Sequence, residues 1–291
     1  MHISYHIGAH ATDNGQLLRS LLKNKGILAK EGVVVPGPGR YRKTIAEVLV
    51  KLNGGKADQD TQDVLLETIM DQDDAERLIL DHDNFLGVSR RALEHGQFYH
   101  LASDRVSRLR NLFPDSPVEF FIGIQNVATF IPAIFEENGG QDFAGFMRGV
   151  NPLDLFWSDV VGAIRDAVPD CPITVWCNED TPLIWPEVMH EIAGVEPHVR
   201  LKGGFDVLNG IMAKEGLTRL RKYLGSHEPQ NEIQRRRILA AFLDKYALED
   251  EIEAELDLPG WSEELITELT AAYDDDVLEL SRMPGVTVLT A

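Results

Sequence analysis

The stretch that decides the fold runs Ile3-Ser4-Tyr5-His6-Ile7-Gly8-Ala9-His10-Ala11-Thr12-Asp13-Asn14-Gly15-Gln16-Leu17-Leu18. Its first part alternates apolar and polar residues, which is typical of a strand, and its leucines continue at helical spacing. Thr12, Asp13 and Asn14 in between are residue types that cap helix N-termini. A strand, a tight turn and an exposed helix N-terminus commonly bind anions in α/β proteins. The sequence therefore predicts an anion-binding turn from Gly8 to Gln16.

The composition favours a folded protein and argues against nonspecific nucleic-acid and membrane partners. The chain has 291 residues, 44% hydrophobic and 26% charged, which is enough to build a large core. It carries 28 basic and 47 acidic residues and a net charge of -19. Because such a surface repels phosphate groups, we expect no nonspecific binding to nucleic acid or to anionic membranes. The sequence predicts no oligomeric state.

The cysteines and the hydropathy pattern favour a cytoplasmic location. Cys171 and Cys177 are too few for a disulfide framework, and their spacing matches no zinc pattern. We expect them to be reduced structural thiols, as in cytosolic proteins. The N-terminus does not resemble a signal peptide, and no run approaches the ~18 apolar residues of a membrane helix.

Further strand-like segments alternate with helical patterns. Strands are expected at Val33–Val35, Arg77–Leu80, Val118–Ile124, Ile173–Cys177 and, as an edge, Val286–Leu289. Helices are expected over about 14–30, 44–53, 61–71, 87–95, 103–113, 151–168 and 232–256. Two further helices are expected, one that begins at about 127 and one that follows 178–180 and ends near 194. This alternation predicts an α/β fold with a doubly wound, mainly parallel sheet.

We expect one domain over residues 1–291. A helical insertion at about 41–72 is either a solvated hairpin or a lid over a site, and the region of about 201–280 is mostly helical. Because ligands in doubly wound sheets bind at the carboxyl ends of the strands, the polar segments there should converge. These segments are Gly8–Asn14, Asp81–Asn84, Gln125-Asn126 and Asn178–Asp180.

Several stretches resemble the bacterial P-loop sulfotransferases. The opening His6–Thr12, the leucine helix after it and Gly32-Val33-Val34-Val35-Pro36-Gly37 follow the order of that family's first motifs. Later segments are similar as well, namely Leu78–Asp83, Phe120–Asn126, Ile173–Asp180 and Tyr273–Val288. The resemblance implies a P-loop NTPase-like fold. It also implies transfer of a sulfuryl group from 3'-phosphoadenosine 5'-phosphosulfate to a small hydroxyl or amine acceptor.

The resemblance also implies a set of site residues. The family uses a general base near the acceptor, and at the end of the predicted strand His82 or Asp83 is the candidate here, with His82 preferred. The positions that would bind the nucleotide donor are Gly8, His10, Ala11, Thr12, Asp13, Asn14, Gly15, Gln16 and Gln125.

The sequence departs from the family where the donor's charge is bound. Ala11 stands in place of a lysine, and Asp13 in place of a glycine. Gln125 replaces an arginine, and the helix after it, Val127–Glu137, contains no serine for the 3'-phosphate. Alanine cannot stabilise charge on a leaving phosphate, and an ionised aspartate repels it. Candidate substitutes for the lost cation are Arg40, Arg42 and Lys43.

Two alternatives to a sulfotransferase therefore remain open. The first is a non-catalytic binding or interaction protein that keeps the scaffold after losing the donor site. The second is a metal-assisted site that uses His10, Asp13 and His82, because imidazole and carboxylate suit divalent ions. The neighbouring His6, Asp81 and Asp83 belong to the same set of strand-end residues. No dense metal motif such as H-E-x-x-H is present, and the sequence assigns no metal ligand.

Overall fold

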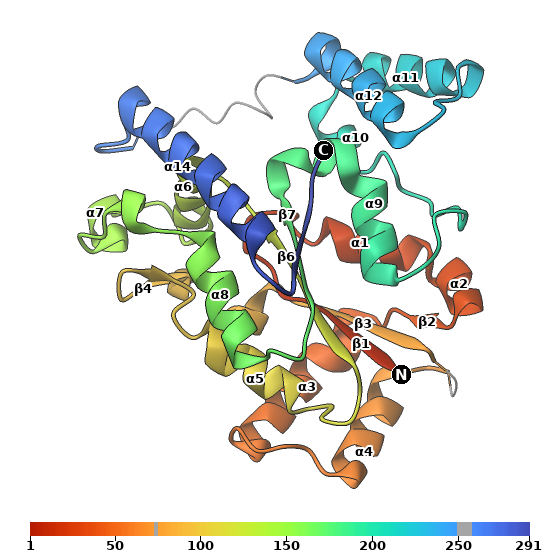
Figure 1. Cartoon of the computed structure of the whole chain (residues 1–291), viewed down its shortest axis with the longest axis vertical. Coiled ribbons are helices and arrows are strands. Elements are labelled where there is room, and N and C mark those ends of the chain that lie inside the picture. Colours follow the sequence, from red (N-terminus) through yellow and green to blue (C-terminus); the bar gives the residue numbers. More distant parts are fainter. Residues whose placement is uncertain (73–74, 249–257) are drawn as a thin grey trace.

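The computed structural model describes residues 1–72, 75–248 and 258–291. These residues form an α/β fold around a six-stranded sheet (Figure 1). All strand pairs in it are parallel, and the strand order is β2-β3-β1-β6-β7-β8. The strands are β1 (His2–His6), β2 (Val33–Val34), β3 (Arg77–Asp81), β6 (Val118–Ile124), β7 (Ile173–Cys177) and β8 (Val286–Leu289). The predicted parallel sheet is confirmed, including the C-terminal edge strand.

Helices cover both faces of the sheet. One face packs against α1 (Gln16–Lys23), α2 (Lys25–Leu28) and α9 (Thr181–Ala193). The other packs against α3 (Pro38–Leu52), α4 (Gln59–Ile69), α5 (Ala102–Arg110), α6 (Val127–Glu137), α7 (Phe143–Met147), α8 (Trp157–Ala167) and α14 (Glu263–Arg282). Burial on both faces explains why the central strands are almost continuously apolar.

A separate small core joins three C-terminal helices. These are α10 (Leu208–Ile211), α11 (Lys214–Ser226) and α12 (Glu232–Tyr246), which lie together at one end of the molecule (Figure 1). The helix predicted to run from 232 to 256 ends at Tyr246 in this structure, and its last part lies outside the described residues. In the part of the chain that the structure describes, no helix is both long and apolar enough to cross a membrane.

The helix predicted near 87–95 is wrong. The chain instead forms short 3-10 turns, η2 (Asp83–Leu86) and η3 (Ser89–Arg91), followed by an antiparallel hairpin of β4 (Leu93–Glu94) and β5 (Gln97–Phe98). His95 and Gly96 connect the two strands with φ angles of 57° and 74°. Two successive positive φ angles make the two-residue turn that suits the twist of a hairpin, so local turn geometry outweighs the helical pattern.

Other helix boundaries differ for identifiable reasons. The helix predicted over 14–30 is divided at Asn24 and ends in the 3-10 turn η1 (Ala29–Glu31). The side chain of Asn24 donates to the backbone carbonyl of Lys202 and accepts the backbone N–H of the same residue, and these contacts hold the chain at the break. The helix predicted from 44 begins at Pro38, a residue suited to a first helical turn. The helix predicted from 151 begins at Trp157, after the 3-10 turn η4 (Pro152–Asp154), and a further 3-10 turn, η5 (Asn178–Asp180), precedes α9.

The predicted insertion is part of the main core. Tyr41 and Ile45 of α3 and Leu65 and Ile69 of α4 are buried against the sheet. The insertion is therefore packed, rather than a solvated hairpin. Its α3 forms one wall of the groove described below.

Candidate functional site

The strand order reverses at β1, whose neighbours are β3 and β6. Such a reversal is where doubly wound sheets place their ligands. Here the ends of β1 and β3 join His6 to Asp81 through a 2.7 Å contact between Nδ1 and Oδ2, and both side chains are buried. Arg42 of α3 donates to the other oxygen of Asp81 at 3.2 Å, and the Tyr41 hydroxyl donates to its backbone carbonyl. Asp81 is thus the centre of a closed polar network.

The imidazole of His6 has a hydrogen-bond partner at one ring nitrogen only. Its ring stacks on Trp176 with centroids 5.5 Å apart, and its Nε2 is buried without a hydrogen-bond partner among the described residues. Burial alone would lower the pKa of His6, but the hydrogen bond to Asp81 and the nearby carboxylates of Asp13 and Asp83 raise it overall. His6 therefore favours the protonated state more than a free histidine does.

The carboxylate of Asp13 occupies the N-terminus of α1. One oxygen accepts the backbone N–H of Gly15 at 3.0 Å, and the other accepts that of Leu17 at 2.7 Å. These N–H groups are the ones that a helix offers to a bound anion. The predicted strand, turn and helix N-terminus are present, and the Asp13 side chain occupies the position at which an anion was expected.

The other turn residues are bound to one another. The Thr12 hydroxyl donates to the Ala9 carbonyl, and Gln16 bonds Ser20 through its amide nitrogen. Ala11 has a φ of 55° and supplies no polar atom from its side chain. Gly8 and Asn14 also have positive φ angles, at 118° and 49°, and Gly15 has one of 72°. The turn is tightly folded, with the Thr12 hydroxyl and the Gln16 amide directed to internal partners and Asn14 exposed.

The candidate cations do not replace the missing lysine. Arg40 donates to the Met70 carbonyl, and Lys43 pairs with Glu47 on the surface. Arg42 reaches the strand ends, but it already pairs with Asp81. Of the three predicted substitutes, only Arg42 lies near the site.

His10 has a structural role. Its backbone N–H and its Nδ1 both contact the Tyr99 hydroxyl, at 3.1 and 2.8 Å, and its Nε2 lies 3.2 Å from Asn84 Oδ1. The hydroxyl accepts the backbone N–H and can donate to Nδ1, so this network favours the tautomer with its proton on Nε2. Every polar atom of the buried ring is then satisfied.

The Gln125 side chain is bonded at its nitrogen only, because its Oε1 is buried without a hydrogen-bond partner among the described residues. Its amide nitrogen donates to Thr129, and its backbone carbonyl accepts the indole N–H of Trp157 at 2.8 Å. The neighbouring Asn126 caps α6, and its backbone N–H donates to Glu179. Gln125-Asn126 and Glu179 therefore hold helices in place.

His82 and Asp83 form the predicted pair at the end of β3. His82 Nδ1 lies 3.1 Å from Asp83 Oδ1. This hydrogen bond lowers the pKa of Asp83 to about 2, so the carboxylate stays ionised at neutral pH. A carboxylate that holds one imidazole nitrogen leaves the other to act as a base. The geometry of the pair fits the predicted role.

The ring of His82 lines a groove of about 580 Å³ between α3 and α5. Arg42, Arg105 and Arg108 lie along the groove, and Nε of Arg105 is buried without a hydrogen-bond partner among the described residues. Its apolar wall includes Val50, which is 78% exposed. Arg42 already pairs with Asp81, and Arg108 pairs with Asp104, which also lines the groove. Arg105, for which no ion pair with another described residue is found, is the guanidinium that suits an anionic group, and the exposed apolar carbons suit an apolar part of the same ligand. We refer to this cavity as the arginine groove; it is lined by Arg42, Ile45, Ala46, Leu49, Val50, His82, Asn84, Phe85, Val88, Asp104, Arg105 and Arg108.

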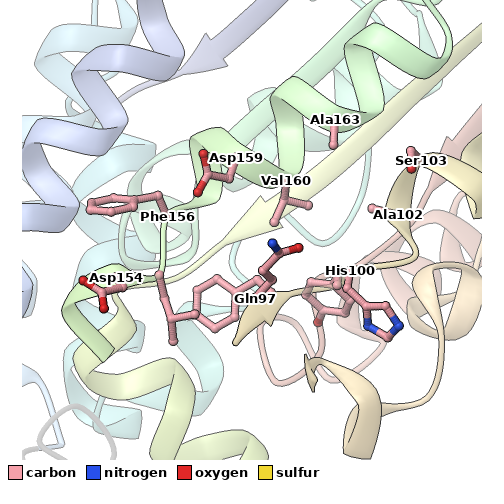
Figure 2. A pocket seen from close by; sticks show the side chains of 12 residues that line it. Gln97, His100, Ala102, Ser103, Asp154, Phe156, Asp159, Val160 and Ala163 are labelled. Carbon is pink, nitrogen blue, oxygen red and sulfur yellow. The ribbon is translucent and has the colours of Figure 1, made fainter. Parts of the chain in front are cut away.

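A second cavity, of about 340 Å³, lies between α5, α8 and the β4–β5 hairpin (Figure 2). Asp154, Asp159, Gln97 and His100 supply its polar groups, and Phe156 lies at one side. Tyr99, the partner of His10, also lines it. The carboxylates make this cavity unsuitable for an anion.

The six strand-end residues converge only in part. Single ligand atoms of His6, Asp13 and Asp81 lie within 4.8 Å of one another, whereas His10 and His82 do not belong to this group. The predicted metal set of His10, Asp13 and His82 is therefore not assembled in this structure. Glu94, His95 and His100 form another such group, on the hairpin that the sequence predicted as helix.

Sequence reasoning missed several of these residues. Tyr99 and the arginines of α5 carry no motif, because their roles come from contacts across about 60 to 90 residues of chain. The segment Glu94-His95-Gly96-Gln97 did contain a usable signal, a glycine after a residue that tolerates positive φ. Comparisons with protein-family models, with curated proteins and with solved structures give no match to this chain.

Proposed function

We propose that this chain is a sulfotransferase-like protein that no longer binds 3'-phosphoadenosine 5'-phosphosulfate at its first turn and acts as a small-molecule binding protein. The observation that supports this proposal most strongly is the position of Asp13, whose carboxylate accepts hydrogen bonds from the N–H groups of Gly15 and Leu17. A phosphosulfate would need the same two N–H groups.

The energetics support this proposal. An ionised carboxylate about 5 Å from a phosphosulfate repels it by a few kcal/mol at an effective dielectric near 20. Ala11 offers no compensating charge, and Gln125 bonds Thr129 in place of a 3'-phosphate. The residues present therefore do not fit the nucleotide donor.

The family assignment is part of the same proposal. It is supported by the ordered resemblance of the strand and turn motifs and is compatible with the parallel sheet that reverses at β1. A P-loop NTPase-like ancestry explains why a strand–turn–helix unit remains at the centre of the sheet after its charged residues have changed.

Calorimetry with 3'-phosphoadenosine 5'-phosphate tests the proposal. We expect no binding to the wild-type protein at millimolar nucleotide. The double variant Ala11→Lys with Asp13→Gly, which returns the cation and frees the two N–H groups, should gain measurable affinity. Saturable binding by the wild-type protein would refute the proposal.

A second candidate function is enzymatic, and the pairing of His82 with Asp83 favours it. In this reading the arginine groove binds a small hydroxyl or amine acceptor, and His82 takes its proton. The molecule that donates the transferred group would then bind at a place other than the turn from Gly8 to Gln16. Screening an acceptor library for modified product, with His82→Asn as the matched inactive variant, tests this candidate. Product formation that persists in His82→Asn would reject the role of His82.

A further inference from the structure

We propose that Glu94, His95 and His100 form a binding site for a first-row divalent cation of the Zn²⁺ type. The site lies on the β4–β5 hairpin, away from the first turn and from the arginine groove. It is independent of the proposed function, and either can fail without the other.

The hairpin brings the three ligands together. Glu94 ends β4, His95 is the first residue of the two-residue turn, and its positive φ turns the side chain back over the hairpin. Tyr99 follows β5 with a φ of 44°, and this bend returns His100 to His95. The two imidazole centroids are 4.6 Å apart with the rings nearly perpendicular.

The ligand atoms must move closer together to share an ion. One nitrogen of each imidazole and one oxygen of Glu94 lie within 4.8 Å of one another. Bonds of about 2.0–2.2 Å from zinc in tetrahedral geometry put two ligands of one ion about 3.3–3.6 Å apart. A closure of at most about 1.5 Å is therefore needed, which rotation of these side chains supplies.

The donor atoms are available. His100 Nδ1 is buried and has no hydrogen-bond partner among the described residues. No hydrogen bond from His95 to another described residue is found. Arg91 bonds Oε2 of Glu94, the oxygen that lies 3.9 Å from His100 Nδ1, so an ion would bind the other oxygen or replace this bond. A buried imidazole nitrogen without a partner, such as His100 Nδ1, is otherwise unfavourable, and a bound cation removes that cost.

The group of His6, Asp13 and Asp81 is a weaker candidate for the same ion. Asp13 gives both oxygens to backbone N–H groups, and Asp81 gives its two oxygens to His6 and Arg42. A cation there would have to displace these internal donors. At the hairpin it would displace none of the contacts of His95 and His100.

The hairpin site is open to solvent and to two cavities. His95 is exposed and lines a cavity of about 530 Å³, together with Arg148 and Asp154. His100 lines the cavity of Figure 2, which shares Asp154 with the first. Three protein ligands at an accessible position leave coordination sites for water, as in sites where the ion binds a further ligand.

Titration of tag-free, metal-free protein with Zn²⁺, and with Co²⁺ followed by its visible absorption, tests the proposal. We expect one equivalent to bind. His95→Asn keeps the positive φ and creates an Asn-Gly turn suited to the hairpin, so it should fold normally while binding weakens on the order of 100-fold. His100→Ala should behave in the same way.

Two controls make the result decisive. His198→Ala removes an exposed histidine elsewhere, and Asp13→Asn alters the competing group; both should bind as the wild type does. The proposal is overturned if the wild-type protein shows no saturable one-to-one binding. It is also overturned if His95→Asn binds normally, or if Asp13→Asn abolishes binding.

Discussion

The carboxylate of Asp13 lies 2.7 Å from the backbone nitrogen of Leu17, the second residue of α1. An internal anion thus takes the position where α/β proteins with this opening bind an external one. The same contact that caps the helix occupies the N–H groups that an external anion would need.

Removing the Asp13 carboxylate should destabilise the protein. We expect Asp13→Ala to lower the free energy of unfolding by about 1 kcal/mol, because two N–H groups of α1 lose their acceptor. Asp13→Asn keeps an oxygen and should cost less. Urea denaturation measures both, and Asp58→Ala at the cap of α4 is the matched control with a similar loss. An unfolding free energy of Asp13→Ala equal to that of the wild type would show that Asp13 does not cap α1.

A methyl group at Gly123 should disturb the packing around His6. A Cβ there would lie 3.0 Å from Trp176 Nε1, and Trp176 stacks on His6. We expect Gly123→Ala to cost about 1–3 kcal/mol in stability, the usual range for overpacking. Gly26→Ala, with nothing within 4 Å, should be neutral or stabilising. Equal thermal midpoints for the two variants would show that Trp176 is free to move.

The His6–Asp81 pair should make stability depend on pH. Because the pKa of His6 is raised in the folded protein, its contribution is complete below the unfolded pKa of about 6.5. It is lost as the pH rises through the higher folded pKa. The difference in unfolding free energy between wild type and His6→Asn should therefore shrink above about pH 6.5. In an Asp81→Asn background that trend should vanish; if it persists, Asp81 is not its cause.

Arg105 should control ligand binding in the arginine groove. Its guanidinium has a buried Nε without a described partner, so an anionic group placed there gains a charge-assisted hydrogen bond. We expect Arg105→Gln to weaken the binding of decyl sulfate about tenfold or more, in line with the energy of such bonds. Arg165→Gln, which removes a surface pair with Asp166, should have no effect. Unchanged binding by Arg105→Gln would place the ligand elsewhere.

Much of the sheet could be predicted because its strands are strongly patterned. Val118–Ile124 and Ile173–Cys177 match β6 and β7, and Val286–Leu289 matches β8. These segments are apolar runs bounded by turn residues, so periodicity and length identify them. The hairpin at Glu94–Gln97 was missed because two-residue strands have no periodicity to detect.

The site was harder to predict, because hydrogen bonds across the fold decide which polar residues are free. His10 looks like a ligand in the sequence, yet Tyr99 and Asn84 satisfy it. His82 and Asp83 were correctly placed beside each other at a strand end, which adjacency in the chain already suggests. Arg105 lies on α5, which carries no sequence motif, so its place in the arginine groove can be recognised only from the tertiary structure.

A crystal structure grown with 3'-phosphoadenosine 5'-phosphate tests the central claim most directly. We predict that the Asp13 carboxylate stays on the N–H groups of Gly15 and Leu17, with no nucleotide density at the turn from Gly8 to Gln16. Phosphate oxygens bound to those two N–H groups, with Asp13 turned away, would contradict it.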